Sequence, residues 1–217
     1  MSLCESADCK LCDFLETKSE VETSFTRMET QKTKCKFGQA GVCCKLCSNG
    51  PCKITPKSPR GVCGADADTI VARNFLRAIA AGSACYLHVV ENTARNLKSI
   101  GEGKGNISIK STETLNALAE VLNITEDDTN KKAIKVAEEI LKDLYKPKYE
   151  KMQLVKKLAY GPRFAKWEEL GILPGGAKSE VFDAIVKTST NLGSDPVDML
   201  LNALRLGVAT GIYGLVL

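Results

Sequence analysis

The sequence predicts an all-α protein with an irregular, cysteine-rich loop at its front. Two observations predict the helices: apolar residues recur at spacings of three and four over long runs, and acidic residues stand where such runs begin. In addition, no segment alternates apolar and polar residues over the length of a strand. The loop is predicted because residues 35–64 hold six of the ten cysteines together with five glycines and three prolines, a composition that disfavours regular structure.

Composition divides the chain into three segments. Residues 1–34 are polar and include a helix-compatible run at 20–32, and residues 35–64 form the cysteine loop. Residues 65–217 indicate a helical domain, in which one long helix extends from about residue 66 to Gly101. Acidic residues stand near the start of this helix, where they interact favourably with the positive end of the helix dipole, and apolar residues recur along it at helical spacing. The acidic residues are Asp66 and Asp68, and the apolar ones are Ile70, Val71, Phe75, Ile79, Ala80 and Leu87.

Shorter helices separated by breaks are predicted after the long one. An approximate capping box at Ser111 or Thr112 begins the first, Pro147 ends the second, and the pair Gly161-Pro162 ends the third. The pair Asp195-Pro196 begins the last. The predicted helices cover residues 111–124, 127–146, 150–160, 178–189 and 195–217, with a turn at Leu-Pro-Gly-Gly before the fourth.

The last predicted helix is strongly apolar, and the sequence stops at Gly-Leu-Val-Leu without a charged cap. Large exposed apolar patches are rare on soluble monomers, so we expect this helix to meet another domain or chain. We also expect the 217 residues to be a truncated form, a split-gene product or a piece of a longer enzyme. The apolar residues concerned are Leu200, Leu201, Leu204, Leu206, Val208 and Ile212.

Bulk properties exclude several classes of protein. A chain of 217 residues can bury a core without disulfides. Its net charge is +4, and the sequence contains no dense basic run of the kind that binds nucleic acid. The N-terminus lacks the pattern of a signal peptide, and the apolar C-terminal run of 11 residues is too short to span a membrane. We therefore expect a cytoplasmic protein, in which clustered cysteines indicate metal binding more often than disulfides.

The neighbouring thiols of Cys43 and Cys44 are awkward ligands for one compact centre, because consecutive side chains point in different directions. Two centres resolve this difficulty. One takes the four thiolates of Cys44, Cys47, Cys52 and Cys63. The other takes Cys43 with Cys35 and lacks two ligands, which a two-fold axis would supply from a second copy of the chain.

Spacing leaves the metal open between zinc and iron–sulfur. Zinc ribbons usually have two Cys-x-x-Cys pairs, whereas this loop has one and the chain has a single histidine. The glycines of the loop favour a cluster, because they let backbone N–H groups approach and donate to sulfur.

The runs CKFGxxGVCCKLCxxGPCKI and RGVCGADADTIVARNFLR resemble the N-terminal part of the nickel–iron carbon monoxide dehydrogenases of anaerobes. The resemblance is specific from residue 35 to about residue 80. It implies that Cys35 and Cys43 help hold a cluster that bridges the two subunits of a homodimer. It also implies that Cys44, Cys47, Cys52 and Cys63 hold one [4Fe–4S] cluster in each chain.

The resemblance further implies a function. In the full enzyme, CO and water become CO₂, two protons and two electrons at a Ni–Fe–S cluster, and the electrons leave through the two clusters named above. A ferredoxin-like acceptor, the remaining catalytic domains and acetyl-CoA synthase are the implied partners. Lys32, Lys34, Lys36 and Lys45 would attract an acidic acceptor, although an ordinary solvated face explains them equally well.

Two departures from the family pattern stand out. The nickel site needs a histidine and several cysteines from two α/β domains, and no cysteine follows Cys85 here, so we expect the isolated chain to be inactive. Where many members of the family carry several histidines, this sequence has only His88, which puts a proton relay in doubt. A hybrid-cluster-type redox protein and a zinc-stabilised interaction module remain the alternatives. Anaerobically purified cluster protein would be brown, whereas zinc protein would be colourless.

The other cysteines carry less information. Cys4, Cys9 and Cys12 have a ferredoxin-like spacing, but an additional site would need a fourth ligand, and an N-terminal tail with exposed thiols is the simpler interpretation. We expect Cys85 to be a small buried hydrophobe and His88 to be a surface or hydrogen-bonded histidine rather than a ligand.

Overall fold

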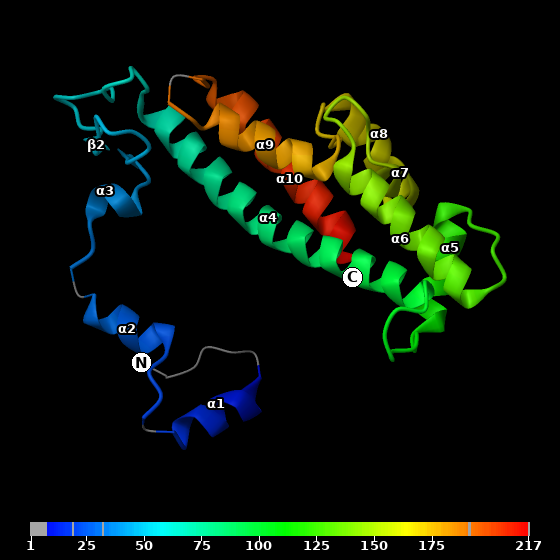
Figure 1. Cartoon of the computed structure of the whole chain (residues 1–217). Coiled ribbons are helices and arrows are strands. Elements are labelled where there is room, and N and C mark those ends of the chain that lie inside the picture. The colour runs from blue at the N-terminus through cyan, green and yellow to red at the C-terminus, as the bar shows by residue number, and fades with distance from the viewer. Residues whose placement is uncertain (1–7, 19, 32, 191, 217) are drawn as a thin grey trace.

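The computed structural model describes residues 8–18, 20–31, 33–190 and 192–216. Within these ranges the chain forms ten helices and one two-stranded antiparallel sheet, so the all-α prediction is confirmed (Figure 1). The first elements are α1 (Cys9–Glu16), α2 (Ser24–Thr30), α3 (Lys36–Gln39), β1 (Cys43–Cys44) and β2 (Cys52–Lys53). The helical domain contains α4 (Ala67–Gly101), α5 (Thr112–Leu122), α6 (Thr129–Tyr145), α7 (Gln153–Leu158), α8 (Gly161–Glu169), α9 (Ala177–Lys187) and α10 (Pro196–Gly214).

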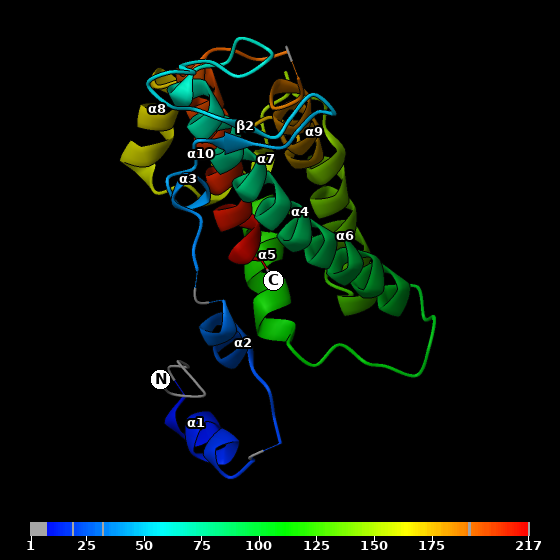
Figure 2. The ribbon, with the colours of Figure 1, turned by 90° about the vertical axis from the view of Figure 1, so that its left-hand side faces the viewer.

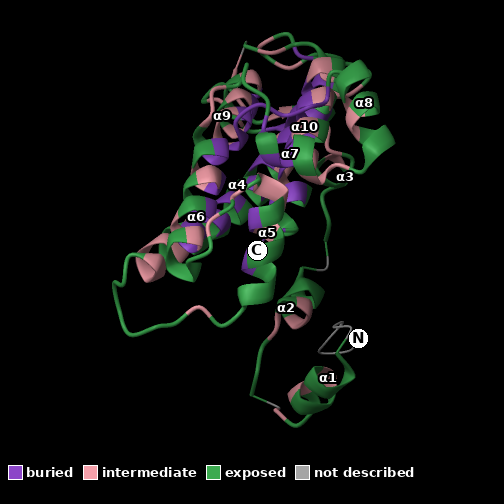
Figure 3. Ribbon diagram, turned by 90° about the vertical axis from the view of Figure 1, so that its right-hand side faces the viewer, coloured by how far each residue is buried: buried purple, intermediate pink, exposed green. Residues whose placement is uncertain are grey.

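Helix α4 is the central element of the helical domain. It packs against α6, α9 and α10, and buried residues gather where these helices face one another (Figure 3). The cysteine loop lies at the N-terminal end of α4, at one end of the helical body (Figures 1 and 2). The position of the candidate site therefore depends on how the first turns of α4 are held.

The core face of α4 differs in part from the predicted one. Val71 and Phe75 are exposed, whereas Ile70 and Leu76 are buried. Hydrophobicity alone misplaced the face because polar residues belong to it and shift its centre. The buried residues of α4 are Thr69, Ile70, Ala72, Arg73, Leu76, Ala80, Ser83, Leu87, Val90 and Ala94.

Helix ends follow the predicted signals at most positions. The side chains of Asp66, Asp128 and Asp195 each accept a hydrogen bond from a backbone N–H in the first turn of α4, α6 and α10, respectively. The capping box predicted at Ser111 is absent from α5, because the Ser111 hydroxyl pairs with the Thr114 hydroxyl at 2.9 Å instead.

Three helices of the described residues were not predicted, namely α1, α3 and α8. The pair Gly161-Pro162 was expected to end a helix, and it does separate α7 from the next segment of the chain. However, it also opens α8, because proline is well suited to the first turn of a helix, where its missing N–H costs nothing.

The N-terminal segment carries two helices that lie apart from the helical body (Figures 1 and 2). The predicted run at 20–32 forms α2, which begins with a reciprocal capping box between Thr23 and Thr26. Cys9 is exposed and Cys12 half-buried on α1, while Cys4 lies outside the described residues.

The last helix divides its apolar residues between two environments. Leu206 and Ile212 are buried in the chain's own core, contrary to the expectation that they would face another domain or chain. Leu200 and Leu204 are exposed and line an apolar groove of about 680 Å³ together with Trp167 and other residues. None of the helices in the described ranges has the length and apolar composition that crossing a lipid bilayer requires.

A glycine pair joins the start of α9 to the end of α6. A Cβ at Gly175 would stand 2.0 Å from the backbone oxygen of Lys148, and one at Gly176 would stand 1.6 Å from that of Lys146. The carboxylate of Glu180 accepts the Gly175 N–H at 2.9 Å and closes the turn. Only glycine permits this backbone contact.

We therefore expect Gly176→Ala to lower the free energy of unfolding by about 2–3 kcal/mol, the usual cost of forcing a methyl group into occupied space. Gly82→Ala is the matched control, because a Cβ at Gly82 meets nothing within 4 Å and alanine favours a helix interior by roughly 1 kcal/mol. Urea unfolding measures the free energy of unfolding of both variants. Equal stability of the two variants would contradict the close contact.

Candidate metal centre

The cysteine loop contains more regular structure than its composition predicted. Strands β1 and β2 form a short antiparallel ladder in which Cys43 faces Lys53 and Cys44 faces Cys52. The ladder extends one residue further, since the Ile54 N–H donates to the Val42 carbonyl at 3.1 Å. Strand pairing tolerates the surrounding glycines and prolines because none of them occupies a paired position: Gly50 and Pro51 lie in the turn between the strands, and the others lie before β1 or after β2.

The two neighbouring thiols occupy different environments. Cys43 and Cys44 are consecutive strand residues, so their side chains leave the backbone on opposite faces. Cys44 is only 8% exposed and packs in a small cluster with Ala65 and Ile70, while Cys43 is half-buried. Thiols on opposite faces are what two separate centres would require, and the assignment of Cys43 and Cys44 to different centres stays a prediction.

The turn between the strands carries Cys47. The Gly50 N–H donates to the Cys47 carbonyl at 3.1 Å. A Cβ at Gly50 would lie 3.2 Å from the Cys44 carbonyl oxygen and 3.3 Å from that of Cys47, so a larger residue would open the turn. The turn therefore keeps Cys47 beside the ladder that holds Cys44 and Cys52.

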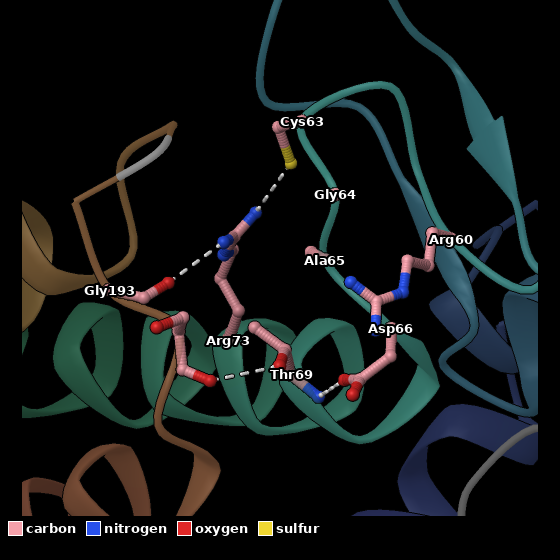
Figure 4. A pocket seen from close by; sticks show the side chains of 9 residues that line it. Arg60, Cys63, Gly64, Ala65, Asp66, Thr69, Arg73 and Gly193 are labelled. Atoms are coloured by element: carbon pink, nitrogen blue, oxygen red, sulfur yellow. Dashed lines mark hydrogen bonds between the residues drawn. The ribbon is translucent and has the colours of Figure 1, made fainter.

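Backbone N–H groups face the sulfur atoms of the later cysteines. The Val62 N–H donates to Cys52 Sγ at 3.5 Å. The Ala65 N–H, with help from Arg73, holds the pKa of the Cys63 thiol below its ordinary value. Figure 4 shows the Arg73 guanidinium directed at Cys63, and its Nη1 lies 4.0 Å from the sulfur.

Cys35 lies at the exposed start of the site, immediately before α3. The N–H groups of Gly38 and Phe37 lower the pKa of its thiol, and the charges of Lys53 and Lys45 lower it further. The Phe37 carbonyl accepts the Val42 N–H at 3.1 Å, which folds α3 back onto the segment that leads to Cys43. Of the lysines predicted to flank this pair, Lys32 lies outside the described residues.

Two residues of α4 that the sequence did not single out hold the loop in place. Asn74 Nδ2 donates to the carbonyls of Gly41 at 2.9 Å and Cys43 at 3.0 Å. Arg73 contacts Cys63 from the preceding position. Their only local signal is a pair of adjacent polar residues in an apolar helix, because their partners are distant in sequence.

The donor set fits an iron–sulfur cluster chemically. Cys44, Cys47, Cys52 and Cys63 supply four thiols from one ladder and two adjoining turns, and N–H groups directed at sulfur are a known means of tuning such clusters. In the described part of the chain, no three His, Cys, Asp or Glu side chains form a group that could hold a metal ion. In a cluster, each thiolate would bind a separate iron.

The remaining candidates lie away from the loop. Cys85 is exposed on α4, which corrects the prediction of a buried hydrophobe; it misses the face on which Ser83 and Leu87 are buried. His88 is exposed as expected, and its Nε2 lies 3.1 Å from Asn92 Nδ2.

Comparison with known proteins identifies the class. The profile of the Prismane/CO dehydrogenase family matches residues 42–217, and the chain belongs to this family. A carbon monoxide dehydrogenase of Methanopyrus kandleri is 50% identical over 221 residues, which cover 97% of this chain and 34% of that protein. A carbon monoxide dehydrogenase of Methanocaldococcus jannaschii is 52% identical over 198 residues, which cover 91% of this chain and 32% of that protein.

Solved structures agree with the curated relatives. A nickel-free carbon monoxide dehydrogenase from Thermococcus sp. AM4 superposes with a TM-score of 0.84 at 35% identity, covering 98% of this chain and 34% of that one. A chain in the structure of an acetyl-CoA synthase/carbon monoxide dehydrogenase, whose alpha subunits carry NiZn[Fe4S4] and NiNi[Fe4S4] clusters, superposes with a TM-score of 0.87 at 26% identity. This match covers 97% of the present chain and 33% of that one. The chain thus corresponds to about one third of the length of these oxidoreductases.

Proposed function

We propose that this chain is the iron–sulfur electron-transfer domain of a carbon monoxide dehydrogenase. The observation that carries the proposal is the divergence of Cys43 and Cys44 on one strand, with Cys44 buried opposite Cys52. Family membership supports it. An iron–sulfur cluster held here would accept and release single electrons, and the chain would supply its ligands, its burial and its hydrogen bonds to sulfur.

The internal cluster is assigned to Cys44, Cys47, Cys52 and Cys63, one [4Fe–4S] per chain. A second cluster is assigned to Cys35 and Cys43 together with the same pair from a second copy in a homodimer. The exposure of Cys35 supports the second assignment, because a thiol that completes a shared site must be reachable from outside the chain.

The electron acceptor is proposed to be a ferredoxin-like protein that approaches the shared cluster. Lys45 and Lys53 act electrostatically on Cys35, so the surface there attracts an acidic partner. The catalytic domains of the full enzyme and acetyl-CoA synthase are further proposed partners, and the proposed location is the cytoplasm.

Replacing Cys47 by Ser should remove one ligand of the internal cluster. We expect iron to fall by about four atoms per chain and the EPR signal of the reduced internal cluster to vanish, because the cluster loses one of the four thiolates that hold it. Cys85→Ser is the matched control, since Cys85 is an exposed thiol on α4 away from the loop. Unchanged iron in the Cys47 variant would refute the assignment.

The double variant Cys35→Ser, Cys43→Ser should keep the internal cluster and lose iron equal to one shared centre per dimer. Iron per chain and sedimentation of the loaded protein measure the two quantities together. Metal bound only by the dimer stabilises the dimer by mass action, so dissociation should also shift to higher protein concentration. Loss of the internal EPR signal in this variant would instead place both thiols in one centre with Cys44.

The 217 residues alone should not oxidise CO. The sequence holds one histidine and no cysteine after Cys85, which leaves no further ligand set for nickel. The measurement is CO-dependent reduction of a viologen by the anaerobically purified, nickel-supplied chain. Turnover in this assay would show that the chain holds a nickel site of its own.

A further inference from the structure

Arg73 is a buried charge without a carboxylate partner. Its side chain is on the core face of α4, and the residue is only 2% exposed. Nη2 donates to the Gly193 carbonyl at 3.1 Å, Nη1 faces Cys63 Sγ at 4.0 Å, and Nε has no partner. None of the ion pairs among the described residues involves Arg73, whereas Arg205, whose side chain is 11% exposed, pairs with Glu180.

A guanidinium in this position stays protonated, so it cannot escape burial by losing its charge. Buried charges require a compensating group of opposite sign. The other charged groups of the adjoining recess are Arg60 and Asp66. Asp66 accepts the Thr69 N–H at 2.9 Å and interacts electrostatically with Arg60. The acceptor left facing Arg73 is the sulfur of Cys63 (Figure 4).

We propose that Arg73 is the counter-cation of the cluster ligated by Cys63 and that it raises the reduction potential of that cluster. The inference rests on the proposed function, in which Cys63 is a cluster ligand. A fixed positive charge in a poorly solvated site stabilises whichever oxidation state is more negative. Reduction adds one electron to the cluster, so Arg73 favours the reduced form.

The position of Arg73 is fixed from two sides. Helix α4 holds its backbone in the core, and the Gly193 carbonyl holds the guanidinium from the loop between α9 and α10. That loop is tightly packed, since a Cβ at Gly193 would lie 2.3 Å from the Lys187 backbone oxygen. The charge therefore has a defined distance from Cys63.

The test is a redox titration of the anaerobically loaded chain, with a low-potential viologen as mediator and dithionite as reductant. The EPR signal of the reduced internal cluster measures how much of the cluster is reduced at each potential. Arg73→Met and Arg73→Gln remove the charge, and Arg73→Lys keeps it. Arg77→Met is the matched control, because Arg77 lies one helical turn further from the loop and donates to the Thr188 hydroxyl at 3.0 Å.

In the neutral Arg73 variants we expect the ratio of reduced to oxidised cluster at a fixed potential to fall at least about tenfold, which corresponds to a shift of about 59 mV for one electron. Arg73→Lys and Arg77→Met should stay close to wild type. Loss of the cluster from both neutral variants, with retention in Arg73→Lys, would also support the counter-cation.

A loaded cluster whose potential is the same in Arg73→Met and wild type would overturn the inference and leave the proposed function standing. Loss of the cluster from Arg73→Lys as well as from the neutral variants would also overturn it, because the shape of arginine and not its charge would then be required. A wild-type chain that binds no iron would overturn the proposed function and this inference together.

Discussion

A helix of 35 residues is about 50 Å long and can bury one face along that length only if partners cover it from end to end. Helices α6, α9 and α10 supply this cover for α4, and the cysteine loop contacts α4 near its first turns through β1. The loop contributes only a small apolar cluster of its own, around Cys44 and Ile70. The geometry of the candidate site is therefore inherited from the packing of α4.

The alternation of side chains along a strand decides how the thiols are distributed. The β1–β2 ladder fixes the directions of Cys43 and Cys44, and the burial of Cys44 beside the half-buried Cys43 results from those directions. A loop without the ladder could rotate either thiol toward either side. The short pairing thus places the side chains of two adjacent cysteines on opposite faces of one strand.

The helices and the set of cysteines could be predicted because their signals are local. Asp128 and Asp195 begin helices through contacts within one turn, and the divergence of adjacent thiols needs only an extended backbone. The role of Gly161-Pro162 was ambiguous because the same residues end one helix and begin another. The exposure of Val71, Phe75 and Cys85 depends on which helices pack against α4, which no local pattern records.

Arg73 and Asn74 show why the rest of the site was beyond sequence reasoning. The Gly193 partner of Arg73 lies 120 residues away and the partners of Asn74 lie 33 and 31 residues away, and an arginine in a helix ordinarily indicates a solvated face. In the fold, these two neighbours hold the cysteine loop against α4, Asn74 through the backbone of Cys43 and Arg73 through the sulfur of Cys63. A loop ordered in advance loses less conformational entropy when it binds its ligand. Polar contacts from α4 thus hold the loop in position, whereas apolar packing holds the helices.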